Sequence, residues 1–291
     1  TLNNMELVLG SAQFGLDYGI SNSDGVTNIN EITRVLNYAK KIKIKKIDTA
    51  YAYGDSHKNL AKASIKNFKV VSKLPSLEGV EFDKNYPREV IQETLSDLNL
   101  NQIEGFLFHS SNDLLSSKGD YFYRILNNLK EEGYMKKLGV SIYDPNDIKF
   151  LVKNFDLEII QTPLNVFDRR IAHLDVLNDL KKRNIKIQAR SIFLQGLLLM
   201  NINSLPIYFS SWSQHMRAWD KFNKNNKINA IESCINFIKN QSFLDEVIVG
   251  VNNLNQLKEI HSHFIKTNII QFDDELKNDD LDLIDPRNWK I

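Results

Sequence analysis

The chain has 291 residues, of which 42% are hydrophobic and 25% are charged, a composition typical of a globular domain with a substantial core. Its 37 basic and 36 acidic residues leave a formal net charge of +1, so the charge balance gives no support for binding to nucleic acid or to a membrane surface. A single cysteine, Cys234, excludes an intrachain disulfide, and no apolar run approaches the roughly 18 residues of a membrane span. We expect one domain over residues 1–291, located in the cytoplasm.

Eight short apolar runs are spaced along the chain and are rich in β-branched and large apolar residues, which predicts buried strands. They lie at residues 7–10, 46–49, 70–73, 105–109, 137–141, 157–161, 185–189 and 246–250. Segments with a helical period separate them, most clearly at residues 32–39, 90–98, 123–129 and 174–180. Strands that alternate with helices pair in parallel, and eight such units in 291 residues predict a closed (β/α)8 TIM barrel, with an open doubly wound sheet as the alternative.

The segment from about residue 197 to residue 239 is longer than one barrel helix requires. Pro206 interrupts it, and two helical patterns follow, at residues 212–222 and 228–238. We therefore expect extra helical segments near residues 197–239, forming an additional helix or a lid-like excursion beside the active face of the barrel.

Four polar side chains end or closely follow the second to fourth predicted strands: Asp48, Tyr53, Lys73 and His109. In a parallel barrel, reacting groups lie at the C-terminal ends of the strands. A tyrosine hydroxyl with its free pKa of about 10 donates a proton poorly near neutrality, and a neighbouring lysine ammonium lowers that pKa. An aspartate that pairs with the lysine limits the cost of burying the ammonium. Taken singly, each residue has an ordinary structural explanation, but the four at successive strand ends predict a proton-donating site.

A series of short motifs surrounds these residues in chain order. They read Asp48-Thr49-Ala50-Tyr51-Ala52-Tyr53-Gly54, Val71-Ser72-Lys73-Leu74, Phe106-Leu107-Phe108-His109, Gly139-Val140-Ser141, Gln161-Thr162-Pro163-Leu164-Asn165 and Gln195-Gly196-Leu197-Leu198. Together they resemble the aldo-keto reductase superfamily, from about residue 7 to residue 259. The resemblance implies reduction of a carbonyl by hydride from C4 of a nicotinamide, with Tyr53 as general acid. By the same analogy Lys73 and Asp48 tune the tyrosine, and His109 orients the carbonyl.

The resemblance also implies a bound NAD(P)H. The residues that it places around the cofactor are Ser11, Ala12, Ser141, Gln161, Arg190, Ser191, Phe193, Gln195, Gly250, Asn252 and Gln256. Family habit favours NADP(H) over NAD(H), although Gln256 stands where an arginine is common and Lys258 is the only cation in residues 250–259. A 2′-phosphate would then be held by amides, by Lys258 and by a helix N-terminus.

Two positions depart from the family pattern. Ile142 follows Ser141, where the family often has asparagine, so the nicotinamide carboxamide loses one expected partner. Arg190 stands where many members stack a tyrosine on the nicotinamide. Its guanidinium plane can stack on the ring, which would favour the reduced cofactor, or it can bind the cofactor pyrophosphate or an anion on the substrate.

Three functions fit this pattern: an active carbonyl reductase, a cofactor-binding regulatory module of the same fold without significant turnover, and a cofactor-free barrel isomerase or lyase acting on sugars. The presence of all four catalytic residue types favours the reductase. Residues 10–20 and 284–289 resemble bacterial family members associated with surface-sugar biosynthesis, which makes a sugar or nucleotide-sugar carbonyl the expected substrate. No metal site is expected, because His261 and His263 point apart on a helix.

Overall fold

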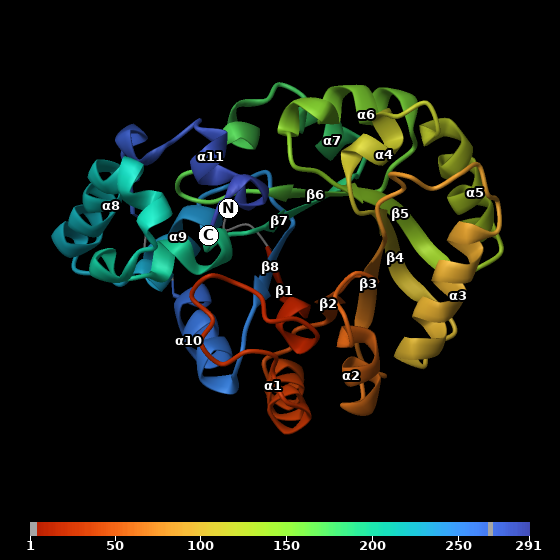
Figure 1. Ribbon diagram of the computed structural model, residues 1–291, viewed down its shortest axis with the longest axis horizontal. Helices are drawn as coiled ribbons and strands as arrows, with labels where there is room; N and C mark the ends of the chain where they lie inside the picture. Colours follow the sequence, from red (N-terminus) through yellow and green to blue (C-terminus); the bar gives the residue numbers. More distant parts are fainter. Residues whose placement is uncertain (1–4, 267–269) are drawn as a thin grey trace.

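Eight parallel strands close into a barrel, in chain order from β1 to β8 (Figure 1). They are β1 (Glu6–Gly10), β2 (Lys46–Asp48), β3 (Lys69–Leu74), β4 (Ile103–Phe108), β5 (Met135–Ser141), β6 (Ile159–Pro163), β7 (Lys186–Arg190) and β8 (Glu246–Gly250). This computed structural model describes residues 5–266 and 270–291. The barrel prediction is confirmed, since all eight predicted strands form within two residues of their expected ends. The open sheet is excluded because β1 pairs with β8.

Helices surround the barrel (Figure 1). They are α1 (Ile29–Lys41), α2 (Ser56–Lys62), α3 (Tyr86–Leu98), α4 (Ser111–Leu115), α5 (Gly119–Glu131), α6 (Ile148–Asn154), α7 (Leu177–Lys182), α8 (Ser213–Asn226), α9 (Ala230–Lys239), α10 (Leu254–Phe264) and α11 (Leu281–Ile284). The helix predicted at 174–180 is shorter than expected, because α7 begins only at Leu177. Within the described ranges, none of the helices combines the length and the apolar character needed to cross a membrane.

The extra helical segments predicted near residues 197–239 are confirmed as α8 and α9, which follow β7 and precede β8. In Figure 1, α8 lies at the outer edge of the molecule, beyond α9. Trp219 anchors α8 to the barrel side by donating an indole hydrogen bond of 2.9 Å to the Leu198 carbonyl. The segment therefore extends the wall of the barrel next to its C-terminal end.

The interior of the barrel alternates between polar and apolar layers. Val71, Leu107 and Ile159 form a small apolar cluster of their own, separate from the larger core between strands and helices. Because side chains along a strand alternate between its two faces, Lys73 on β3 points to the same inner face as Val71, one layer further along. Inward-facing polar side chains such as Lys73 therefore lie near the C-terminal end of the barrel, while the outer faces of the same strands pack against the helices.

Candidate active site

A cavity of about 470 Å³ lies at the C-terminal ends of the strands. The predicted catalytic and cofactor-binding residues all line it. They are Asp48, Tyr53, Lys73, His109, Ser11, Ala12, Ser141, Gln161, Arg190, Ser191, Phe193, Gln195, Gly250, Asn252 and Gln256. The fold therefore brings residues that are far apart in the sequence to one site. Half of the residues that line the cavity were predicted from the sequence.

Asp48 and Lys73 form a buried ion pair at the base of the cavity. The Lys73 ammonium donates to Asp48 Oδ2 at 2.7 Å and to the Thr49 carbonyl at 2.9 Å. Lys73 is 1% exposed and Asp48 is 4% exposed, so the pair is out of water. Burial lowers the pKa of Lys73, and the Asp48 carboxylate acts against that shift.

Tyr53 lies in the turn between β2 and α2, above this ion pair. The Lys73 nitrogen is 5.2 Å from the centre of the Tyr53 ring. The turn packs against Gly15, where a β-carbon would lie 1.9 Å from the Tyr53 carbonyl oxygen, so only glycine fits there. Burial, followed by the Asp48 charge, raises the pKa of Tyr53, and Arg190 lowers it. This direction differs from the expected lowering by Lys73, because the loss of water around the hydroxyl and the Asp48 charge outweigh the effect of Arg190.

His109 follows β4 and lies beside Tyr53, with the two ring centres 6.0 Å apart and the rings nearly perpendicular at 76°. Burial lowers the pKa of His109 to about 3, and the charges of Lys73 and Arg190 contribute to the shift. The imidazole is therefore neutral near pH 7 and carries one N–H donor.

Gln161 connects the ion pair to the rest of the barrel. Its amide nitrogen donates to Asp48 Oδ1 at 2.8 Å and to Gln188 Oε1 at 3.1 Å, and the Ser141 hydroxyl donates to its oxygen at 3.4 Å. Sequence reasoning missed Gln188, which has the same inward register on β7 as Gln161 has on β6. Because side chains alternate between the two faces of a strand, the predicted strand at residues 185–189 could have indicated that Gln188 faces the barrel interior.

At the other end of the cavity, the segment after β1 contacts the loops after β7 and β8. The Ile20 amide donates to the Gln195 carbonyl at 3.0 Å. The Asn252 side chain donates to Asn22 Oδ1 at 2.9 Å, and the Asn252 amide donates to Gln256 Oε1 at 2.7 Å. These contacts connect three loops around the predicted cofactor residues.

Comparison with known proteins identifies the family. A sequence model of the aldo/keto reductase family matches residues 6–275. The chain belongs to the aldo/keto reductase family. It is 24% identical over 258 residues to a protein of Bacillus subtilis (strain 168) described as the uncharacterized oxidoreductase YqkF, covering 80% of this chain and 82% of that one.

Solved structures share the fold of this aldo/keto reductase. AKR11C1 from Bacillus halodurans, in its holo form, matches with a TM-score of 0.72 at 18% identity, over 91% of this chain and 88% of its own. The glycerol dehydrogenase AKR11B4 from Gluconobacter oxydans matches with a TM-score of 0.69 at 21% identity, over 91% and 87%. Family membership makes the chain an oxidoreductase of a family that reduces carbonyl compounds and generally uses nicotinamide cofactors.

Arg190 ends strand β7 of this aldo/keto reductase and lines the cavity. Its guanidinium donates to the Ile142 carbonyl at 2.8 Å and to the Ser191 hydroxyl at 3.2 Å. Its Cζ lies 4.4 Å from the centre of the Tyr143 ring, and Arg287 Cζ lies 3.6 Å from the centre of the same ring. Tyr143 thus contacts two guanidinium groups at the C-terminal end of the barrel.

Tyr143 and Tyr18 also line the cavity, and sequence reasoning missed both. Tyr143 follows the end of β5 by two residues, which was a usable signal. Tyr18 lies in the long segment after β1, within the residues 10–20 that carry a family resemblance, but that resemblance assigned it no role. Burial and the neighbouring Tyr53 raise the pKa of Tyr18 to about 12.

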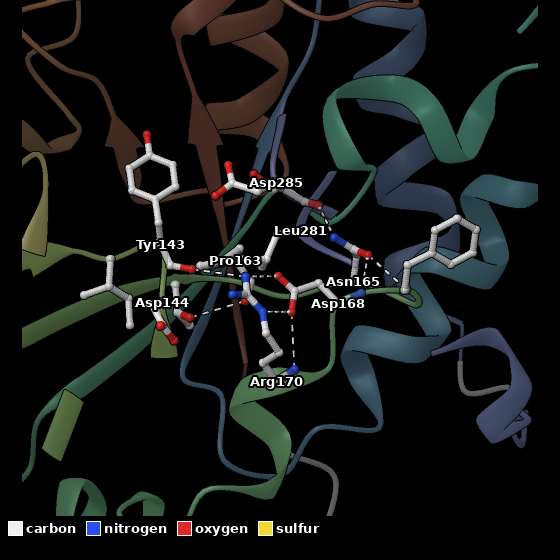
Figure 2. A network of polar contacts seen from close by, with 12 residues as sticks. Tyr143, Asp144, Pro163, Asn165, Asp168, Arg170, Leu281 and Asp285 are labelled. Atoms are coloured by element: carbon white, nitrogen blue, oxygen red, sulfur yellow. Dashed lines mark hydrogen bonds and ion pairs between the residues drawn. The ribbon is translucent and has the colours of Figure 1, made fainter. Parts of the chain in front are cut away.

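A polar network fixes the backbone at Tyr143 (Figure 2). Arg170 donates to both carboxylate oxygens of Asp168, at 2.9 and 2.7 Å, and to the Tyr143 carbonyl at 3.1 Å. Asn165 Oδ1 accepts the Asp168 amide at 2.9 Å. Because Asp168 is fully buried, this network holds the loops after β5 and β6 in one arrangement.

The two histidines of α10 point to different neighbours, as their spacing predicts. The His261 ring packs against Tyr38, and His263 lies 3.4 Å from Glu232. In the part of the chain that the structure describes, no group of three or more His, Cys, Asp or Glu side chains is arranged to hold a metal ion.

Proposed function

We propose that this chain reduces an aldehyde or ketone to an alcohol with a nicotinamide cofactor, with Tyr53 as the general acid. The observation that carries the proposal is the position of Tyr53, which lies between the buried Lys73–Asp48 pair and a neutral His109 at the base of the cavity. Tyr53 is protonated near neutral pH, the form that donates, but burial raises the pKa of its hydroxyl, so proton transfer depends on stabilisation of the phenolate by the nearby cations. The low pKa of His109 removes it as a competing acid.

The size and lining of the cavity support a bound cofactor. Its volume of about 470 Å³ is in the usual range of about 300–1,000 Å³ for small-molecule sites. Gln13 Oε1 is buried without a partner in its wall, an acceptor that a ligand donor would satisfy. Ser141 and Gln161 would hold the nicotinamide carboxamide, and the loop of Asn252 and Gln256 would hold the adenine end. When bound, the reduced cofactor supplies the hydride to the carbonyl carbon.

The protein residues then handle the carbonyl oxygen. The neutral His109 donates its N–H to that oxygen and orients it toward Tyr53. The Tyr53 hydroxyl transfers its proton to the oxygen as negative charge develops there. The Lys73 ammonium, 5.2 Å from the Tyr53 ring, stabilises the resulting phenolate, and Asp48 holds the ammonium in place.

The residues expected around the adenine end of the cofactor give less support to NADP(H) than the family resemblance does. Lys258 lies 5.9 Å from the centre of the Tyr38 ring, and Glu259 lines the cavity one residue later. A carboxylate repels a 2′-phosphate and accepts a hydrogen bond from a 2′-hydroxyl. We therefore expect the kcat/KM for NADH to be at least as high as that for NADPH, which parallel assays with both cofactors measure.

The substrate that we propose is a small sugar or nucleotide-sugar carbonyl. The resemblance of residues 10–20 and 284–289 to sugar-associated family members supports it. The name of the Gluconobacter oxydans neighbour, a dehydrogenase of the polyol glycerol, agrees with a hydroxylated substrate.

Tyr53→Phe tests the proposed acid, with Tyr51→Phe as the matched control. Tyr51 lies in the same turn, but its hydroxyl donates to Glu93 at 2.7 Å. We expect Tyr53→Phe to lose reduction of an aldehyde panel by about 10²–10⁴-fold while its Kd for NAD(P)H stays within about threefold. Tyr51→Phe should keep its rate.

Turnover by Tyr53→Phe close to wild type would exclude the assignment. Cofactor binding without turnover of any aldehyde or keto-sugar by the wild type would favour a regulatory module. Absence of cofactor binding would favour a cofactor-free isomerase or lyase.

A further inference from the structure

Arg190 differs from its neighbouring arginines in how its charge is balanced. At the same end of the barrel, Arg170 pairs with Asp168 at 2.7 Å and Arg287 pairs with Asp285 at 2.5 Å. Over residues 5–266 and 270–291, no Asp or Glu side chain forms an ion pair with Arg190. Lys73, the other cation that lines the cavity, is neutralised by Asp48 (see above). Glu259, the other carboxylate that lines the cavity, forms no ion pair with Arg190 either, so within the described residues no side chain directly neutralises the Arg190 charge.

The Arg190 guanidinium also has hydrogen-bonding capacity left. A guanidinium has five N–H donors, and two are used, by the Ile142 carbonyl and the Ser191 hydroxyl. The Nε is buried without a partner. The stack on Tyr143 and the Ile142 contact fix the plane of the group. A planar, fixed guanidinium is suited to binding a carboxylate or a phosphate.

This charge lies at the reacting end of the cavity. Arg190 lines the same cavity as Tyr53 and His109. It acts electrostatically on both, lowering the pKa of each. An anion bound at Arg190 would therefore be close to the carbonyl that Tyr53 protonates.

We propose that Arg190 is a specificity-determining residue that selects carbonyl substrates with a carboxylate or phosphate group close to the carbonyl. The proposal rests on the proposed function and adds a substrate class to it. Two chemical facts argue against the cofactor as the partner of Arg190. Hydride transfer leaves a cationic nicotinamide ring, which a guanidinium repels, and the anionic pyrophosphate of the cofactor is separated from the reacting ring by a ribose.

The test compares three aldehydes on one scaffold: 4-formylbenzoate, its neutral methyl ester, and 4-formylphenyl phosphate. The measured quantity is the ratio of kcat/KM for each anion to that for the ester. We expect Arg190→Gln to lower this ratio by about 10–100-fold, mainly through KM, as expected for a lost hydrogen bond to a charged group. Arg190→Lys should restore part of it. The larger of the two anion effects identifies carboxylate or phosphate as the preferred group.

Arg287→Gln is the matched control, because Arg287 stacks on the same Tyr143 ring while its charge is paired with Asp285. It should change the ratio by less than about threefold. An unchanged ratio in Arg190→Gln for both anions would overturn the proposal. A uniform loss for all three aldehydes together with weaker NAD(P)H binding would also overturn it, and would place Arg190 at the cofactor.

A binding measurement separates this proposal from the proposed function. Calorimetric titration with 4-(hydroxymethyl)benzoate and with its methyl ester reports anion recognition without turnover. If the wild type reduces no aldehyde but binds the anion at least tenfold more tightly than Arg190→Gln does, the proposed function fails and the anion site stands. Equal anion binding by wild type and Arg190→Gln overturns the anion site, whatever the turnover.

Discussion

His57 is a buried residue whose ionisation makes stability depend on pH. It is 4% exposed, near the start of α2, and its Nε2 lies 3.1 Å from the Ser72 hydroxyl. Burial lowers the pKa of His57 to about 4, and the Lys73 charge adds to the shift. The folded state therefore resists protonation of this ring, while the unfolded chain accepts a proton near pH 6.5.

We expect the His57 contribution to stability to be complete above pH 6.5 and to be lost as the pH falls from 6.5 to about 4. A shift of this size corresponds to about 3 kcal/mol of unfolding free energy. Urea unfolding at a series of pH values, for wild type and His57→Gln, measures it. Glutamine keeps a polar group near Ser72 but does not titrate, so the difference between the two curves should fall over this window. A constant difference from pH 7 to pH 4 would contradict the assignment.

At the residue scale, the sequence identified side chains at strand ends better than those in loops. Asp48 and Lys73 were predictable because a buried strand rarely carries a charge without a partner. Tyr143 follows β5 by only two residues, which pointed to the site, but the arrangement of its loop was not predictable, because it depends on Arg170 binding the Tyr143 carbonyl across 27 residues. The direction of the Tyr53 pKa was not predictable, since it depends on how completely the fold removes water from the hydroxyl.

Strand β5 contains a glycine that the barrel requires. A β-carbon at Gly139 would lie 2.3 Å from the Ile159 carbonyl oxygen of the neighbouring strand β6. Backbone cannot yield as a side chain can, so an alanine there must push β5 and β6 apart. Gly105 on β4 is a natural comparison, because its β-carbon would meet side chains and no backbone, with the tip of the Ile159 side chain nearest at 2.9 Å.

We expect Gly139→Ala to lower the unfolding free energy by about 3 kcal/mol or more, and Gly105→Ala by about 1 kcal/mol. Chemical denaturation of both variants without ligand measures the difference. Because β5 ends in Ser141, which binds Gln161, Gly139→Ala should also weaken cofactor binding. Equal stability of the two variants would mean that the barrel tolerates separation of these strands.

At the element scale, the strands were predictable because each buried run is short, apolar and bounded. Long amphipathic helices such as α1 were predictable for a similar reason, since Ile32, Val35, Leu36 and Ala39 share its buried face. Helices α2, α4 and α6 have only seven, five and seven residues, too few to repeat a period. Their positions depend on packing against the barrel, which local sequence does not record.

A chain of buried polar contacts runs through the barrel from one end to the other. At the N-terminal end, Lys46 pairs with Glu246. Glu246 accepts from Gln188 at 2.6 Å, and Gln188 accepts from Gln161 at 3.1 Å. Gln161 continues the chain to the Asp48–Lys73 pair (see above). The stability of the barrel and the arrangement of the candidate active site therefore depend on the same contacts.

Gln188 is the middle of this chain, and Gln188→Met tests it. Methionine has a similar volume but leaves one Gln161 donor and one Glu246 oxygen without their partner. Each buried polar group left unpaired costs about 1–3 kcal/mol, so we expect the two to lower the unfolding free energy by about 2–6 kcal/mol. We also expect weaker cofactor binding, because Gln161 is no longer held on its β7 side. Urea unfolding and fluorescence titration with NAD(P)H measure the two effects.

Glu104→Gln is the control for this prediction. Glu104 lies at the N-terminal end of the barrel, as Lys46 and Glu246 do, but it is not part of the chain of contacts. Its three ion pairs, with Lys69, Lys136 and Lys137, have distances of 4.0, 3.9 and 3.7 Å and involve partly exposed lysines. Glu104 is only 9% exposed, but its partners reach solvent and an amide can still accept from them, so Glu104→Gln should lose less stability than Gln188→Met and no cofactor affinity. If Gln188→Met lost no more stability and no more cofactor affinity than Glu104→Gln, the contacts through the barrel interior would not couple the two ends of the barrel. A loss of stability in Gln188→Met with unchanged cofactor affinity would limit the role of Gln188 to the barrel itself.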